Sequence, residues 1–162
     1  MKKSFILAAF MVVLGATMAY AQPRAIGANL GYGIDFSYQH GFGEANMLDV
    51  SVNVPFFNGI GGTVTYDWID PFNAPVPWNN KGEWHWYMGV GGGAGMYRFN
   101  APTWYAGVVG HIGIEYDFWF PFQLSLDWRP NFGVWNDTDN NRIGFNTNGL
   151  VSGITLGVRY KF

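Results

Sequence analysis

The sequence predicts an all-β protein, an antiparallel up-and-down transmembrane β-barrel of eight strands. Three observations predict it: the composition, a period of two in the apolar residues and the parity of the turns. Of the 162 residues, 49% are hydrophobic and 19% aromatic, whereas only 12% are charged and 23 are glycine. Such a chain has too much apolar surface and too little charge for a water-soluble globule. After the first twenty residues no apolar run is long enough for a spanning helix, so a closed barrel is the remaining way to satisfy the backbone in lipid.

A secretory signal peptide is predicted over residues 1–21. Lys2 and Lys3 make its start positive, and a short apolar stretch follows them. Ala19 and Ala21 match the small-residue pattern at which signal peptides are cleaved. We therefore expect the protein to be exported and to reside in the cell outer membrane.

The mature protein is expected to begin at Gln22, so that the barrel domain comprises residues 22–162. Cleavage removes two of the nine basic residues, which leaves seven against eleven acidic ones and a net charge of −4. This negative balance excludes nucleic acid as a partner. The chain contains no cysteine, which excludes a disulfide and a lipid-modified N-terminal cysteine.

Apolar residues alternate with small or polar ones along most of the mature chain. The C-terminal segment shows the pattern most plainly, with one apolar row formed by Ile154, Leu156, Val158, Tyr160 and Phe162. Similar alternation occurs over 48–54, 63–68, 83–91, 104–118 and 122–129. A strand of a membrane barrel alternates in this way over about ten residues, with its apolar row toward lipid. The small residues of the opposite row fit a narrow lumen that side chains fill.

The parity of the turns gives the number of strands. If the last strand ends in the periplasm, the link 118–121 is a periplasmic turn and the polar stretch 136–149 is an outer loop. The earlier turns then fall at 100–103, 70–82, 57–61 and 41–46. An exported chain with an even number of strands needs one more strand at its start, so we place a hairpin over 24–39 that turns at 31–33. A single long strand over 25–39 is the alternative.

Aromatic residues provide a check that was not used to place the turns. Under this topology a set of rings lies outward at the periplasmic strand ends: Tyr38, Trp68, Trp84, Trp86, Tyr116, Phe118, Phe122, Tyr160 and Phe162. A sparser set lies at the opposite ends: Tyr32, Phe56, Trp104 and Trp128. Two such girdles are typical of barrels that span a bilayer, because amphipathic rings prefer its interfaces.

Three stretches, 112–118, 123–130 and 156–162, resemble the small eight-stranded outer-membrane barrels of Gram-negative bacteria, of the OmpA-transmembrane and OmpX type. The resemblance covers nearly the whole mature chain and implies the fold, the location and outer-membrane lipids as partners of a monomer. The terminal pattern of Val158, Tyr160 and Phe162 is similar to the signal by which such proteins are received for assembly. The resemblance therefore implies the barrel-assembly machinery as a second partner.

Charged residues are expected inside the lumen. Seven acidic residues fall on the inward rows: Asp35, Asp49, Asp67, Glu83, Glu115, Asp117 and Asp127. We predict a lumen polar network that consists of His111, Glu115, Asp117, Asp127, Arg129, Arg159 and Lys161. Such groups should pair with one another, because an unpaired buried polar group is costly.

No catalytic, cofactor-binding or metal-binding residues are predicted. The three histidines have no metal-ligand spacing, and we interpret His40 as a solvated turn residue. We favour a structural or interaction protein that is not an enzyme and needs no cofactor. A lipid-modifying enzyme is one alternative. His111, Ser125 and a neighbouring acid could form a hydrolase-like set, but we interpret them as paired polar groups that fill the lumen. A minor channel for small solutes is the other.

Overall fold

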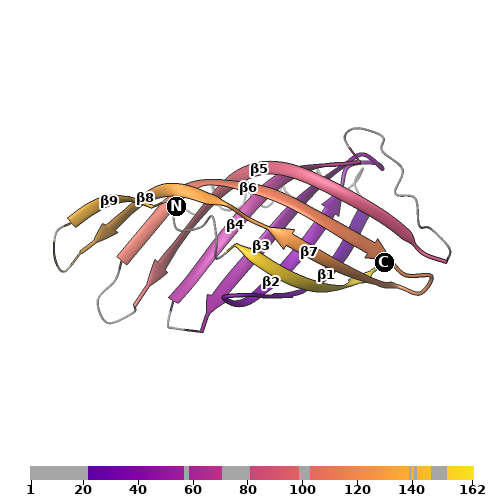
Figure 1. Cartoon of the computed structure of the whole chain (residues 1–162), viewed down its shortest axis with the longest axis horizontal. Helices are drawn as coiled ribbons and strands as arrows, with labels where there is room; N and C mark the ends of the chain where they lie inside the picture. Colours follow the sequence, from indigo (N-terminus) through magenta and orange to yellow (C-terminus); the bar gives the residue numbers. More distant parts are fainter. Residues whose placement is uncertain are drawn as a thin grey trace, which may run out of the picture.

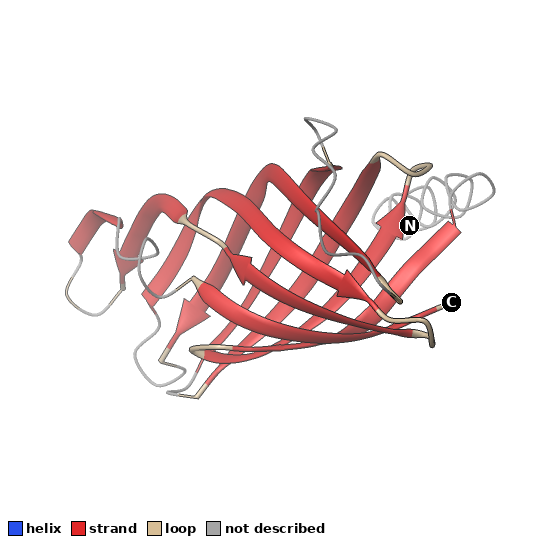
Figure 2. Cartoon of the chain, turned by 45° about the vertical axis from the view of Figure 1, so that its right-hand side comes forward, coloured by secondary structure: helices blue, strands red, loops and turns tan. Residues whose placement is uncertain are grey.

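The described part of the chain consists of β-strands and the turns that join them (Figures 1 and 2). The computed structural model describes residues 22–56, 59–70, 81–98, 103–138, 140, 142–146 and 153–162. Within these ranges no helix is long and apolar enough to cross a membrane. The predicted signal peptide, residues 1–21, lies outside the described residues.

The strands are antiparallel to their neighbours and close into a ring. They are β1 (Gln22–Leu30), β2 (Gly33–Gly41), β3 (Asn46–Pro55), β4 (Gly59–Ile69), β5 (Glu83–Tyr97), β6 (Thr103–Asp117), β7 (Phe122–Trp128), β8 (Asn131–Asp137), β9 (Arg142–Asn146) and β10 (Ile154–Lys161). From β1 to β7 each strand pairs with its successor, β7 pairs with β10, and β10 pairs with β1. The first and last strands therefore complete the barrel.

The ring has eight positions because two of them are each occupied by two short strands. The second half of β6 pairs with β7 and its first half pairs with β8. The break between these two strands falls at Arg129 and Pro130, and proline has no N–H to donate to a ladder. In the same way, β9 continues the position of β10 beside β8. The predicted eight-stranded antiparallel barrel is thus the observed fold.

The structure decides between the two alternatives for residues 24–39 and corrects the prediction for residues 136–149. The hairpin over 24–39 is confirmed, since β1 and β2 pair from Gln22 with Gly41 to Leu30 with Ile34. The alternative of one long strand is therefore wrong. The stretch 136–149 was expected to be a loop, but β8 continues to Asp137 and β9 forms a hairpin with it.

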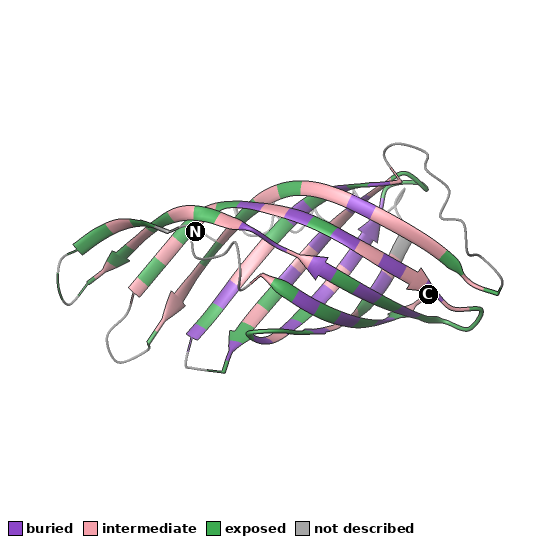
Figure 3. Ribbon diagram, viewed as in Figure 1, coloured by how far each residue is buried: buried purple, intermediate pink, exposed green. Residues whose placement is uncertain are grey.

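The alternation along the strands places polar residues inside and apolar residues outside (Figure 3). The most deeply buried residues include Asn29, Gln39, Asp49, Asp67, His111, Glu115, Gln123, Asp127 and Arg159. Among the described residues only Ala25, Met47, Ile69, Tyr87 and Val109 are both hydrophobic and buried. This distribution is the reverse of that in a water-soluble domain.

Glycine lets the strands of this sheet approach closely along β5. Gly91 has its missing side chain on the inner face, where an added Cβ would collide with the backbone oxygen of Val64 on β4. Gly92 faces outward, and the nearest atom to an added Cβ is the backbone oxygen of Gly107, 3.7 Å away. The same substitution should therefore be costly at Gly91 and nearly neutral at the adjacent Gly92.

Replacing Gly91 with alanine should destabilise the barrel by roughly 1–3 kcal/mol, the usual effect of forcing extra atoms into a packed site. Gly92→Ala should leave the free energy of unfolding within about 0.5 kcal/mol of the unsubstituted protein. Urea unfolding followed by tryptophan fluorescence measures both. Equal effects at the two positions would contradict the assignment of Gly91 to the inner face.

Candidate functional site in the barrel lumen

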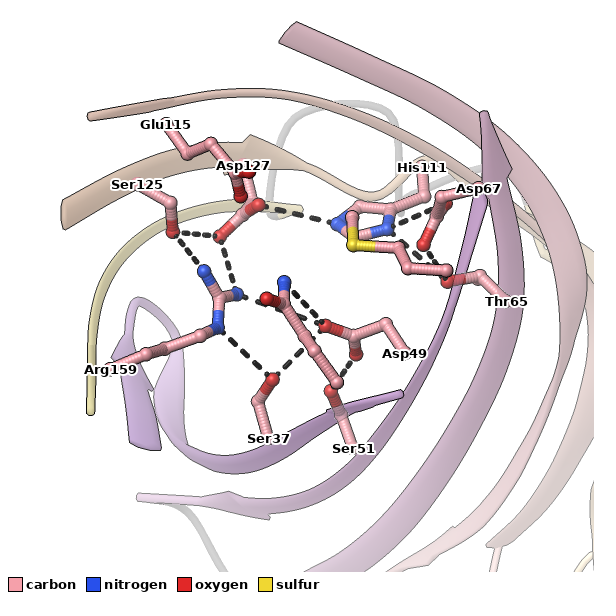
Figure 4. Close-up of polar contacts among 12 residues, drawn as sticks. Ser37, Asp49, Ser51, Thr65, Asp67, His111, Glu115, Ser125, Asp127 and Arg159 are labelled. Atoms are coloured by element: carbon pink, nitrogen blue, oxygen red, sulfur yellow. Dashed lines mark hydrogen bonds and ion pairs between the residues drawn. The ribbon is translucent and has the colours of Figure 1, made fainter. Parts of the chain in front are cut away.

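Ion pairs and hydrogen bonds cross the lumen and meet at the guanidinium of Arg159 (Figure 4). This side chain, on β10, is 1% exposed. It donates to Asp127 on β7 at 3.3 Å, and lies 3.8 Å from Asp49 on β3. It also donates to the hydroxyls of Ser125 at 2.6 Å and Ser37 at 3.2 Å. One buried cation therefore holds together strands from several positions around the ring.

A second guanidinium connects opposite walls of the barrel. Arg129 follows β7, which stands four positions from β3 in the ring of eight. Its side chain donates to Ser51 at 2.6 Å and to Asp49 at 3.2 Å, both on β3. Ser51 in turn donates to Asp49 at 2.7 Å. The carboxylate of Asp49 thus serves both buried arginines, which is the pairing that a buried charge requires.

His111, on β6, lies between two carboxylates. Its Nδ1 is 2.9 Å from Asp67 on β4, and its Nε2 is 3.3 Å from Asp127 on β7. Tyr87 on β5 donates its hydroxyl to Asp127, and the Tyr87 and His111 rings meet edge to face with centroids 5.0 Å apart. Figure 4 shows how Asp127 joins the His111 side of the network to the Arg159 side.

Two further ion pairs extend the network toward the end of the barrel where the chain terminates. Lys161 pairs with Asp117, and Arg24 pairs with Glu115, whose side chain is fully buried. Arg24 was not among the predicted lumen residues. Simple alternation from the exposed Ile26 places residue 24 on the outer face, but a register shift beside Pro23 turns the arginine inward. A bulge of this kind leaves no clear signal in the sequence.

The structure brings the predicted network residues to one inner surface. Each of the following takes part in at least one ion pair: His111, Glu115, Asp117, Asp127, Arg129, Arg159 and Lys161. Ser125 was considered with His111 as part of a hydrolase-like set. Its hydroxyl instead donates to Asp127 at 2.8 Å and accepts from Arg159. Ser125 and Asp127 are therefore hydrogen-bonded to each other and to the guanidinium of Arg159.

Two other interpretations of polar residues are wrong. His40 was interpreted as a solvated turn residue, but it lies within β2, is 7% exposed, and has its Nδ1 3.0 Å from the hydroxyl of Tyr38. The ring of Phe42 packs edge to face against it and helps to exclude water. Glu83 was expected in the lumen, but 73% of its side chain is exposed at the start of β5.

The described residues contain no group of three or more histidine or acidic side chains arranged to hold a metal ion. Comparison with models of known protein families, with characterised proteins and with solved structures finds no match for this chain. The fold and the lumen therefore define the class on their own. It is a closed eight-stranded antiparallel β-barrel with a polar interior crossed by side chains and an apolar exterior.

Removing the charge of Arg159 should destabilise the barrel strongly. We expect Arg159→Met to lower the free energy of unfolding by about 3–5 kcal/mol, because Asp127 and Asp49 keep their buried charges with fewer partners. Urea unfolding of the refolded protein measures the change. The control is Arg142→Met at the exposed start of β9, which should change stability by less than about 0.5 kcal/mol.

A second substitution distinguishes lost charge pairing from lost packing. If unpaired carboxylates cause the instability, adding Asp127→Asn to Arg159→Met should recover part of the loss, since the two residues interact directly. Purely additive effects of the two substitutions would contradict the proposed coupling.

Proposed function

We propose that this protein is an outer-membrane β-barrel protein with a structural and interaction role and a lumen filled by side chains. The observation that supports it best is the reversed distribution of polar and apolar residues. A soluble monomer rarely exposes a continuous apolar patch of more than a few hundred Å². An apolar wall around a polar core is instead what a bilayer requires of a spanning barrel.

The apolar wall continues around the whole ring. Each of its eight positions contributes a large outward residue that is between 42% and 60% exposed: Ile26, Phe36, Val52, Val64, Val90, Ile112, Leu126 and Leu156. Because every position of the ring carries apolar residues on its outside in the part of the chain that the structure describes, lipid on all sides of a monomer accounts for the wall. The backbone of such a wall can lie in lipid because the ring closes.

Aromatic contacts at one end support a position for the bilayer boundary. Rings from β5, β6 and the turn before β7 form a chain of contacts in which Trp84 and Tyr116 have centroids 4.9 Å apart and Tyr116 and Phe118 4.8 Å. The chain continues from Phe118 to Phe120 at 4.9 Å and from Phe120 to Phe122 at 5.7 Å, and it ends at Tyr160 and Phe162. We place the periplasmic interface at this end, since amphipathic rings favour it.

The filled lumen favours a role without transport or catalysis. The interior of an eight-stranded barrel is just wide enough for side chains, and here Arg159 and Arg129 cross it. The polar groups that chemistry would need already bind one another. We therefore propose that the protein is neither a channel nor an enzyme and works without a cofactor.

The proposed location is the cell outer membrane, which the exported chain reaches after cleavage of residues 1–21. Its proposed partners are outer-membrane lipids and, during assembly, the barrel-assembly machinery. The segment offered to that machinery carries the outward residues Val158, Tyr160 and Phe162, which are 46% to 60% exposed. An assembly receptor could bind such a segment as an added strand.

The proposal predicts different sensitivities at two adjacent residues of β10. Leu156 faces outward and is 53% exposed, whereas Thr155 faces the lumen and is 7% exposed. In lipid vesicles, Leu156→Arg should lower the free energy of unfolding by about 2–4 kcal/mol, the effect of a cation near the bilayer midplane. Thr155→Ser should cost less than about 1 kcal/mol. Equal sensitivity, or a protein that folds in water without lipid or detergent, would contradict the membrane location.

Deleting Phe162 should separate assembly from stability. We expect unfolded chain to accumulate in the periplasm, because the assembly receptor can no longer bind the ring of Phe162. The purified variant should still fold in detergent. Cell fractionation and the heat-dependent mobility of folded barrels in gels measure both. The control is Phe122→Ala. This variant also loses an exposed ring that contacts Tyr160, with ring centroids 5.8 Å apart, but it keeps the terminal residue. Normal insertion in cells after the deletion would refute the recognition role.

A further inference from the structure

Three side chains of the lumen carry buried polar atoms that the polar network leaves unpaired. Both amide atoms of Asn29, the hydroxyl of Thr155 and the Nε of Arg129 have no hydrogen-bond partner within the part of the chain that the structure describes. The three residues are 0%, 7% and 8% exposed, respectively. An unpaired buried polar atom is costly, and most such atoms in folded proteins have a partner. A group of four therefore indicates that a further molecule binds them.

The strand register brings these atoms to one region of the inner surface. Asn29 on β1 stands opposite Gly157 on β10, and a Cβ added at Gly157 would lie 2.4 Å from the side-chain oxygen of Asn29. Thr155 is two residues from Gly157 on the same inner face and stands opposite Asp127 on β7. Arg129 is two residues beyond Asp127. The unpaired atoms thus come from three neighbouring positions of the ring, those of β1, β10 and β7.

The surrounding charges disfavour an ion as the partner of these atoms. Asp35 on β2 stands opposite Asn29, so an anion would meet a carboxylate. A cation would meet the guanidinium of Arg129, whose Nε is one of the four atoms. The amide of Asn29 offers both donors and an acceptor, whereas the Nε of Arg129 can only donate. The site therefore suits a small neutral molecule that both donates and accepts hydrogen bonds.

We propose that the lumen holds a bound water molecule between Asn29, Thr155 and the Nε of Arg129. Water is the smallest molecule with the required donors and acceptors, and a buried water has about three polar partners. The site is close to the outer rim, because Gly31 is exposed and a Cβ added there would lie 2.6 Å from the methyl carbon of Thr155. The water joins β1 to β10 and β7 beside the pairing that closes the ring.

The inference depends on the closed ring and its lumen, and not on the proposed membrane location. It can therefore fail while the location holds, and the location can fail while the water site holds. The measurements below use the mature protein in detergent micelles, so that they address the lumen alone.

Nuclear magnetic resonance of the isotope-labelled protein tests the site directly. Bound water should give nuclear Overhauser cross-peaks to the side-chain amide of Asn29 and to the Nε–H of Arg129. The control is the side-chain amide of Gln123, which is 0% exposed and donates to Asp117 at 3.0 Å, and which should give no such cross-peak. Absence of water cross-peaks from both Asn29 and Arg129 overturns the proposal. Equal cross-peaks at Gln123 also overturn it, since water would then not be specific to this site.

An isosteric substitution provides an independent test. Thr155→Val keeps the shape of the side chain and removes its hydroxyl. If water pairs with that hydroxyl, the variant loses a hydrogen bond, so its urea midpoint should fall and the water cross-peak at Arg129 should weaken. Thr155→Ser keeps the hydroxyl and should retain the cross-peak. A higher urea midpoint for Thr155→Val overturns the proposal, because removing a polar group stabilises a protein when that group was buried without a partner.

Discussion

The pairing of the first strand with the last is the constraint on which the rest of this structure depends. β1 and β10 are paired from Ala25 with Lys161 to Leu30 with Leu156, so the sheet has no open edge around its main ring. Once eight positions close, the lumen is narrow and its inward residues must fill it. That closure therefore requires glycine at crowded inner positions such as Gly91. It also separates a polar interior from the apolar exterior.

The narrow lumen in turn determines how charge can be buried. Asp49 forms ion pairs with the guanidinium groups of Arg129 and Arg159. Asp127 forms hydrogen bonds with Arg159, Tyr87 and His111. Replacing a buried ion pair by apolar residues is often neutral or favourable, so net stability does not explain these pairs. Their geometry supports a role in specificity, since Arg129 can satisfy Asp49 only when β3 and β7 stand opposite each other.

The sequence predicts the parts of this structure that depend on alternation, and misses those that depend on irregular backbone or on neighbours. Rows such as that of Leu156 and Val158 repeat every second residue, so their outward direction was predictable. The bulge beside Arg24 breaks the period by one residue and reverses the expected side. β9 has five residues, too few for alternation to indicate a strand. His40 contacts the rings of Tyr38 and Phe42, two residues before and after it, and its burial was missed because it was assigned to a turn instead of to β2.

The extension formed by β5, β6, β8 and β9 is a continuation of the sheet, with ladder pairing up to Asp137 and Arg142. Its inner face has glycines covered by rings: Tyr105 lies over Gly95, and Trp135 lies over Gly144. Tyr97 stacks on Tyr105 with centroids 4.9 Å apart. Such rings supply the contacts that glycine lacks and hold a sheet in shape. Because these rings support the extension from its inner side, its ladder continues in register to the last pair, Asp137 with Arg142.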